Sequence, residues 1–174
     1  PRAVEADLVD AVLDVAAAHG DRKLFERMRD EAKKTPDARR RGKILGALAS
    51  FRDPAIARDA YALVLSPDFD VRESIAVLYY ATIYNEVAQW DFMKENFDAL
   101  LARLPNESRT ALAGVGSRFC DEARRDEYAA FFKDRAARIT GGPRQVAQAL
   151  EGISLCIARR KAHEPSLTAF LRKY

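Results

Sequence analysis

The chain has 174 residues, of which 48% are hydrophobic and 32% are charged, and its formal net charge is only +3. Acidic and basic residues alternate along it, whereas a nucleic-acid-binding surface gathers its basic residues on one face, so no nucleic-acid partner is expected. No apolar run reaches the roughly 18 residues that a membrane span requires, so no membrane partner is expected either. The length suits one soluble domain over residues 1–174.

A short pattern recurs along the chain, in which an aromatic or imidazole residue is followed by one spacer and an aspartate. It occurs at 19–21 (HGD), 51–53 (FRD) and 119–121 (FCD). The first two aspartates are 32 residues apart (53 − 21) and the last two 68 apart (121 − 53), close to two further periods. Aspartate is a favoured helix N-cap, and repeats of this length are typical of stacked helical hairpins. The pattern predicts an all-α fold, an α-solenoid (superhelix) of about five stacked antiparallel hairpins of the HEAT/armadillo-like type.

Apolar residues recur at the helical period in nearly every segment, so no strand is expected. Prolines at 36, 67, 105 and 165 lie between periodic stretches, where helices end, and Pro54 follows Asp53 at a first helical position. The expected helices are 5–18, 22–34, 38–51, 54–65, 71–84, 87–104, 107–118, 122–133, 143–160 and 165–172.

Two apolar stripes are predicted to lie in the core rather than to hold a cofactor. Their residues are Val87, Trp90, Met93, Phe97, Leu100, Leu101 and Leu104 in the first, and Val146, Leu150, Ile153 and Ile157 in the second. The densest basic run, 39–43, is interpreted as the solvated face of a helix whose other side carries Ile44, Leu45, Leu48 and Phe51.

The two cysteines, Cys120 and Cys156, fit a reduced compartment or a pair of small buried hydrophobic residues, because a disulfide framework would need more cysteines. The compartment stays open, with the cytoplasm slightly favoured. The first residue is Pro1 and the residues after it lack signal-peptide character. A fragment of a longer polypeptide is therefore expected.

Catalytic and metal-binding patterns are nearly absent. The only histidines are His19 and His163, too few for a His-based triad or a multi-histidine metal centre. His163 and Glu164 do not begin the H-E-x-x-H zinc motif, since position 167 is Leu and Pro165 intervenes. His19 is interpreted as a residue that complements the dipole at a helix end. We therefore expect no catalytic residue, no metal ligand and no cofactor in this chain, which alone is not an enzyme.

Three stretches resemble the C-terminal helical domain of gluzincin zinc aminopeptidases of the puromycin-sensitive and endoplasmic-reticulum type. They are LGALASFRDPAIARDAYALVLSPDFDVRES (45–74), WDFMKENFDALLARLP (90–105) and GGPRQVAQALEGISLCIARR (141–160). The resemblance implies a non-catalytic part of an enzyme that removes N-terminal residues from peptides. In that family the HEAT-like domain encloses the peptide chamber and controls access to it, while zinc is held by a catalytic domain upstream.

The resemblance also implies that this chain is the later portion of a longer C-terminal domain. Its partners would be the catalytic domain of the same polypeptide and peptide substrates. The alternative is a free-standing HEAT-type scaffold for protein–protein interaction, which predicts capping repeats at both ends.

Val71 and Arg72 match a Val-Arg pair of that family, in which the arginine begins a helix near the chamber. The resemblance therefore implies that Arg72 binds substrate, with its guanidinium available to pair with a peptide carboxylate. The family commonly places Gln and Asp two and three residues further on, where this chain has Ser74 and Ile75. The other interpretation is a surface arginine in a first helical turn, paired to Asp68 or Glu73.

Overall fold

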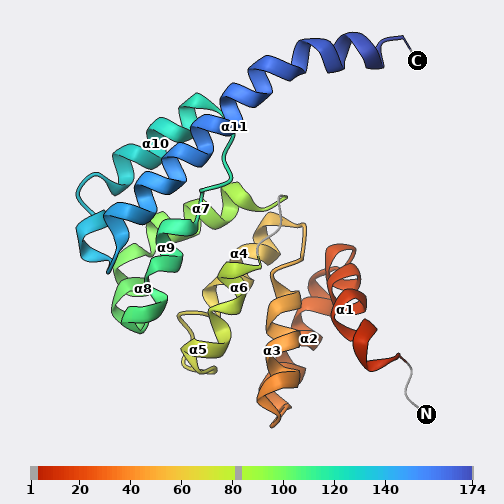
Figure 1. Cartoon of the computed structure of the whole chain (residues 1–174). Coiled ribbons are helices and arrows are strands. Elements are labelled where there is room, and N and C mark those ends of the chain that lie inside the picture. The colour runs from red at the N-terminus through yellow and green to blue at the C-terminus, as the bar shows by residue number, and fades with distance from the viewer. Residues whose placement is uncertain (1–3, 81–83, 174) are drawn as a thin grey trace. The chain divides into compact units, whose positions relative to one another are not determined.

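The computed structural model describes residues 4–80 and 84–173 (Figure 1). These residues form α-helices and short 3₁₀ turns and contain no strand, which confirms the predicted all-α, solenoid-like fold. The chain divides into two compact units, residues 1–105 and 106–174. The prediction of a single domain over residues 1–174 stays a prediction.

The first unit contains η1 (Ala6–Leu8), α1 (Val9–Ala18), α2 (Arg22–Lys34), α3 (Ala38–Leu48), α4 (Pro54–Ala62), α5 (Val71–Ser74), α6 (Ala76–Tyr79), α7 (Glu86–Glu95) and α8 (Phe97–Arg103). The second unit contains η2 (Asn106–Ser108), α9 (Thr110–Gly114), α10 (Glu122–Phe132), η3 (Ala136–Arg138) and α11 (Gly142–Leu171).

Aspartate side chains set where five of these helices begin. In each case a carboxylate oxygen accepts a hydrogen bond from a backbone N–H two or three residues further on, at 2.8–3.0 Å, which satisfies a donor that has no partner inside the helix. In the first unit the caps are spaced by 16, 16 and 17 residues (37 − 21, 53 − 37, 70 − 53). One helix with its connection therefore takes about 16 residues, and the 32-residue repeat in the sequence corresponds to a hairpin of two helices. The capping residues are Asp21, Asp37, Asp53, Asp70 and Asp121.

Helix α3 is the centre of the first unit. It packs against α1, α2, α5 and α6, while α4 packs against α6 and α7. Leu45, Leu48 and Phe51 are fully buried, and the rings of Phe25 and Phe51 meet edge to face at 5.6 Å. Three residues of the predicted apolar side of this segment thus lie in the core, whereas Ile44 is half-buried.

The predicted apolar stripe of 87–104 is buried from Trp90 to Leu104, whereas Val87 is exposed and was wrongly included. The predicted single helix is also divided in two, into α7 and α8. Asn96 lies at the junction, where its side-chain amide donates a hydrogen bond to the carbonyl oxygen of Phe92 at 2.8 Å. An amide side chain that competes for backbone groups favours a helix end at this point.

Other predicted boundaries also need correction. The helix expected over 71–84 is divided into α5 and α6, and positions 81–83 lie outside the described residues. The helix expected over 107–118 is represented by η2 and the short α9.

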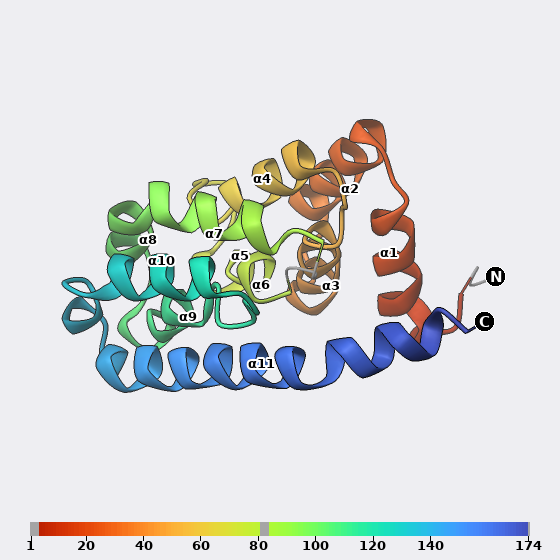
Figure 2. The same ribbon diagram turned by 90° about the horizontal axis from the view of Figure 1, so that it is seen from above.

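In the second unit, α11 packs against α9, α10 and η3, and Val146, Ile153 and Ile157 of the predicted stripe are buried, whereas Leu150 is half-buried. The two helices predicted around Pro165 are one continuous helix in the structure. Every described residue after Ile157 is exposed, so water can satisfy the carbonyl group that Pro165 leaves without a donor. Figure 2 shows the outer part of α11 departing from the line of its first turns.

Cys120 and Cys156 form a disulfide, with their Cα atoms 5.3 Å apart. Neither predicted alternative describes them, because the thiols are joined, Cys156 is exposed and Cys120 is half-buried. The prediction failed because the two residues are 36 positions apart and only the packing of α10 against α11 brings them together. Among the described residues, no helix combines the length and apolar character of a membrane span.

Candidate functional site

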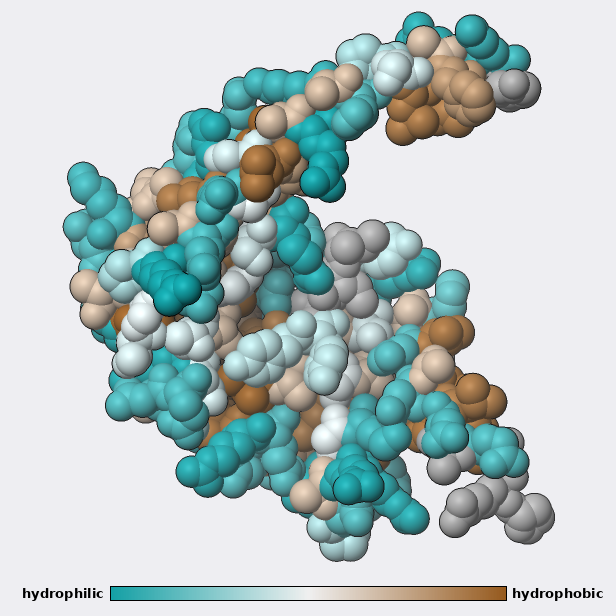
Figure 3. All heavy atoms as spheres, in the orientation of Figure 1, coloured by the Kyte–Doolittle hydropathy of each residue, from teal (hydrophilic) through white to brown (hydrophobic). Residues whose placement is uncertain are grey.

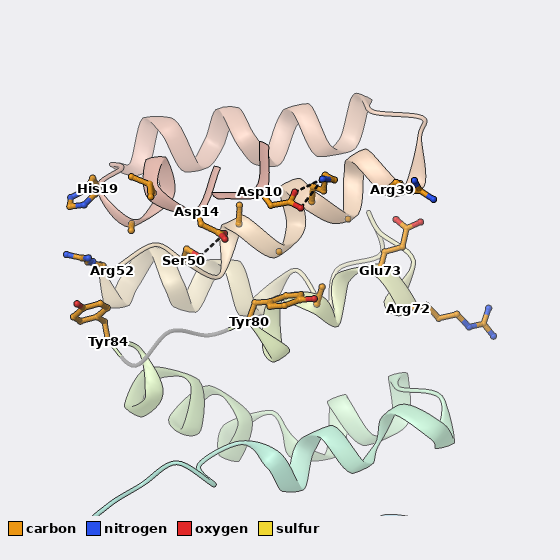
Figure 4. A pocket seen from close by; sticks show the side chains of 17 residues that line it. Asp10, Asp14, His19, Arg39, Ser50, Arg52, Arg72, Glu73, Tyr80 and Tyr84 are labelled. Carbon is orange, nitrogen blue, oxygen red and sulfur yellow. Dashed lines mark hydrogen bonds and ion pairs between the residues drawn. The ribbon is translucent and has the colours of Figure 1, made fainter. Parts of the chain in front are cut away.

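A cavity of about 840 Å³ opens on the first unit, and all the residues that line it belong to that unit. Its walls come from α1, α3, and the segment that carries α5 and α6 (Figure 4). The lining is mixed: alanine and glycine on the floor, two tyrosines, and both signs of charge.

Helix α3 forms the floor because its two sides differ. Leu45 and Leu48 face the core, while Gly42 and Gly46 line the cavity. A Cβ atom added to Gly46 would lie 3.5 Å from the ring of Tyr80, whereas one added to Gly42 would meet nothing within 4 Å. Glycine inside a helix costs up to about 1 kcal/mol relative to alanine, and no steric conflict with described residues requires it at position 42.

Two ion pairs neutralise part of the charge in and around the cavity. Lys43 pairs with Asp10 at 2.8 Å. Arg41 makes a two-pronged contact with Glu73 and donates to the carbonyl oxygen of Thr35 at 2.7 Å, which links α3 to α5. The hydrogen bond to Glu73 raises the pKa of Arg41 above its ordinary value. These acidic groups are therefore already neutralised by neighbouring cations.

Three other arginines in the lining have no carboxylate partner among the described residues. Arg39 and Arg72 lie at one end of the cavity, and Arg52 lies at the other, where its guanidinium is 4.3 Å from the centre of the Tyr84 ring. Figure 4 also shows that Arg72 extends outward from the start of α5. The Arg39–Arg72 end thus holds two guanidinium groups without an ion-pair partner among the described residues, while the capping carboxylates of Asp37 and Asp70 act on the neighbouring Arg41.

Arg72 lies at the rim of the cavity, exposed, with its backbone N–H bonded to the capping Asp70 at 2.8 Å. The structure shows neither of the pairs that the surface-residue interpretation required. Asp68 pairs with Lys33 at 2.6 Å, and Glu73 is taken by Arg41. The guanidinium of Arg72 therefore has no ion-pair partner in the part of the chain that the structure describes.

Apart from Arg72, none of the residues that line the cavity was predicted as a site residue from the sequence. Arg39 and Arg40 of the basic run 39–43 are exposed, as expected for a solvated face, and Arg39, Gly42 and Lys43 of the same run also line the cavity. The tyrosines at 80 and 84 gave no signal by themselves, although a helix-interior glycine on the polar side of α3 could have marked the floor. His19 ends α1, as predicted, and also lines the cavity, while His163 belongs to the second unit.

No cluster of three or more metal-ligating side chains occurs in residues 4–80 and 84–173. The fold and the cavity together define an all-α, solenoid-like protein with an open, charged cavity in its first unit. The sequence model of the ERAP1-like C-terminal domain family matches residues 1–155. The chain belongs to this family of C-terminal domains of ERAP1-like aminopeptidases, which confirms the resemblance drawn from the sequence. No curated protein matches the chain.

Proposed function

We propose that this chain forms the non-catalytic wall of the peptide chamber in a zinc aminopeptidase, assists substrate access, and binds the part of the peptide remote from the scissile bond. One observation carries the proposal. In a member of this family, a cavity of about 840 Å³ presents two arginines, Arg39 and Arg72, that have no carboxylate partner among the described residues. Zinc and the reacting groups would belong to the catalytic domain, its partner in the same polypeptide.

The chemistry of the arginines suits the far end of a peptide. Every unmodified peptide ends in a carboxylate, and a guanidinium binds a carboxylate through two parallel hydrogen bonds. Arg41 is committed to Glu73, so Arg39 and Arg72 are the cations available at this end of the cavity. We assign substrate binding to Arg72, with Arg39 beside it.

Fluorescence anisotropy with the 174-residue chain tests this assignment. The probes are two nonapeptides labelled at the N-terminus, one with a free C-terminal carboxylate and one with a C-terminal amide. Arg72→Ala should weaken binding of the carboxylate peptide about tenfold, or about 1.4 kcal/mol, and the amide much less. Arg72→Lys should recover only part of the loss, because an ammonium cannot make the two-pronged contact.

Arg40→Ala is the matched control, because Arg40 is an exposed arginine on α3 that does not line the cavity. Its binding should equal that of the unmodified chain. Equal affinity for the carboxylate and the amide, or an equal loss in both arginine-to-alanine variants, would contradict the assignment.

A protein-binding scaffold is the second candidate, and an exposed apolar stripe on η1 and α1 favours it. Leu8, Val12 and Val15 are all exposed and lie on one side of the helix, and a brown area covers this part of the surface in Figure 3. The sequence of the full open reading frame that encodes this chain distinguishes the two candidate functions. An upstream H-E-x-x-H motif supports the aminopeptidase wall, and a complete reading frame without one supports the scaffold.

A further inference from the structure

The apolar side of helix α11 continues beyond the core of the second unit. Ile153 and Ile157 are the last buried residues of this helix. Leu167 follows the first of them, and Leu171 the second, by 14 positions (167 − 153, 171 − 157), which is about four helical turns. The two leucines therefore continue the side of α11 that packs in the second unit, although their exposed fractions are 56% and 61%.

The outer part of α11, residues 158–171, is exposed at every position. Figure 1 shows it extending clear of α9 and α10, and a brown area covers this end of the helix in Figure 3. Isolated helices shorter than about 12–15 residues are barely stable in water. A partner that packs on the side of Leu167 and Leu171 would therefore stabilise this segment as well as cover its apolar surface.

The exposed stripe on η1 and α1 has the same spacing as the side of α11 that it would have to meet. Leu8, Val12 and Val15 are separated by four and three positions, and Leu167 and Leu171 by four. Apolar residues three and four positions apart form the contact side of two helices that pack along each other. The stripe on η1 and α1 is therefore suited to receive the outer part of α11.

The charges around the two apolar sides are opposite. Residues 4–18 contain four acidic residues and no lysine or arginine. Residues 158–173 contain five lysines and arginines and one acidic residue, a net charge of +4 (5 − 1). Opposite charges favour contact between unlike sides, whereas two copies of α1, or two copies of α11, would repel each other. The exposed charges without an ion-pair partner among the described residues include Glu5 and Asp7 on the acidic side and Arg172 and Lys173 on the basic side.

We propose that residues 158–171 of α11 dock on the side of η1 and α1 that carries Leu8, Val12 and Val15 in a second copy of this chain. The contact joins two different surfaces, so the copies associate head to tail. A single pair of short helices buries less than the roughly 1,200 Å² of a standard interface, so the association is weak. This inference goes beyond the proposed function and does not depend on it.

Sedimentation equilibrium of the 174-residue chain, from about 5 to about 500 μM at low ionic strength, tests the proposal. The weight-average mass should rise from 19.5 kDa toward twice that value or more. The double variant Leu167→Gln/Leu171→Gln should weaken the association at least tenfold, and so should Leu8→Gln/Val12→Gln. All four side chains are exposed, so a circular dichroism melt should show that each variant keeps its fold.

Leu155→Gln is the matched control. Leu155 is an exposed leucine of α11, 59% exposed, and it lies two positions from Ile153 and from Ile157. Residues two positions apart point to opposite sides of a helix, so Leu155 lies away from the proposed contact. This variant should associate as tightly as the unmodified chain.

Mixing the two double variants identifies which surfaces meet. Each should be monomeric alone at concentrations where the unmodified chain associates. In an equal mixture, one variant supplies an intact η1–α1 side and the other an intact α11, so one complete contact forms and the mass should again exceed 19.5 kDa. Added salt should weaken this association severalfold, because the charges that flank the contact are exposed.

Three results would overturn the proposal. The first is a mass of 19.5 kDa for the unmodified chain at every concentration. The second is association that persists in either double variant alone, which would mean that other surfaces meet. The third is an equal mixture that stays monomeric. A monomer that instead binds phosphatidylserine vesicles, and loses this binding in Leu167→Gln/Leu171→Gln, would assign α11 to a membrane surface and also overturn the contact between copies.

Discussion

Gly42 and Gly142 show how the same residue type serves different purposes in one chain. A Cβ atom at Gly42 would meet nothing within 4 Å, whereas one at Gly142 would lie 2.2 Å from the carbonyl oxygen of Ala136. We expect Gly42→Ala to raise the free energy of unfolding by about 0.8–1 kcal/mol through helix propensity. Gly142→Ala should lower it by about 1–3 kcal/mol, because backbone must shift at the start of α11. Urea denaturation of both variants measures whether the free energy of unfolding rises or falls in each.

The Gly42 variant also tests the cavity. Its new methyl group projects from the floor toward the space where the peptide is proposed to lie, so the more stable protein should bind the carboxylate nonapeptide several-fold more weakly. A gain in stability with unchanged affinity would place the peptide away from α3. A loss of stability would show that position 42 is not an open helical site.

At the scale of elements, the Cys120–Cys156 disulfide connects the residue before the α10 cap to α11 near the last buried residue of that helix, Ile157. The bond closes a segment with a sequence separation of 36. On the chain-entropy account this stabilises the fold by about 3–4 kcal/mol. We expect a phosphine reductant to lower the free energy of unfolding by this amount, which urea denaturation measures as a lower midpoint concentration. Backbone hydrogen exchange should become faster in α10 and α11 and should change least in α2 and α3.

The double variant Cys120→Ala/Cys156→Ala is the control and should be insensitive to the reductant. Thiol titration of the unfolded, unreduced chain gives an independent reading and should find no free thiol. Two free thiols, together with a midpoint that does not respond to reductant, would show that the bond does not form.

At the scale of the whole molecule, the expected division of labour with a catalytic domain can be tested on this chain alone. His19 and His163 belong to different units, both cysteines are oxidised, and the described residues hold no metal-ligating cluster of three or more side chains. A catalytic zinc needs three protein ligands and an open position. After dialysis, elemental analysis should therefore find no stoichiometric zinc, and aminoacyl chromogenic substrates should remain uncleaved. One zinc per chain with chelator-sensitive hydrolysis would contradict this.

The sequence by itself determined the features that depend on neighbouring residues. Asp21, Asp53 and Asp121 cap helices because the groups they satisfy lie two or three residues away, and the stripe from Trp90 to Leu104 is buried because helical periodicity places it on one side. The family was also recognised from continuous stretches of sequence, at 45–74, 90–105 and 141–160. Arg72 could be identified as a candidate through the resemblance, although its ion-pairing state could not.

Only the tertiary structure decided what depends on residues far apart in the chain. The Cys120–Cys156 bond, the pairing of Arg41 with Glu73 across 32 positions and the contact of Ser50 with Asp14 across 36 all require helices to pack first. The pairing of Arg41 with Glu73 removes the anion that could have neutralised Arg72. The charge left in the cavity is therefore a property of the assembled helices, because electrostatic compensation depends on distance in space and not on position in the sequence.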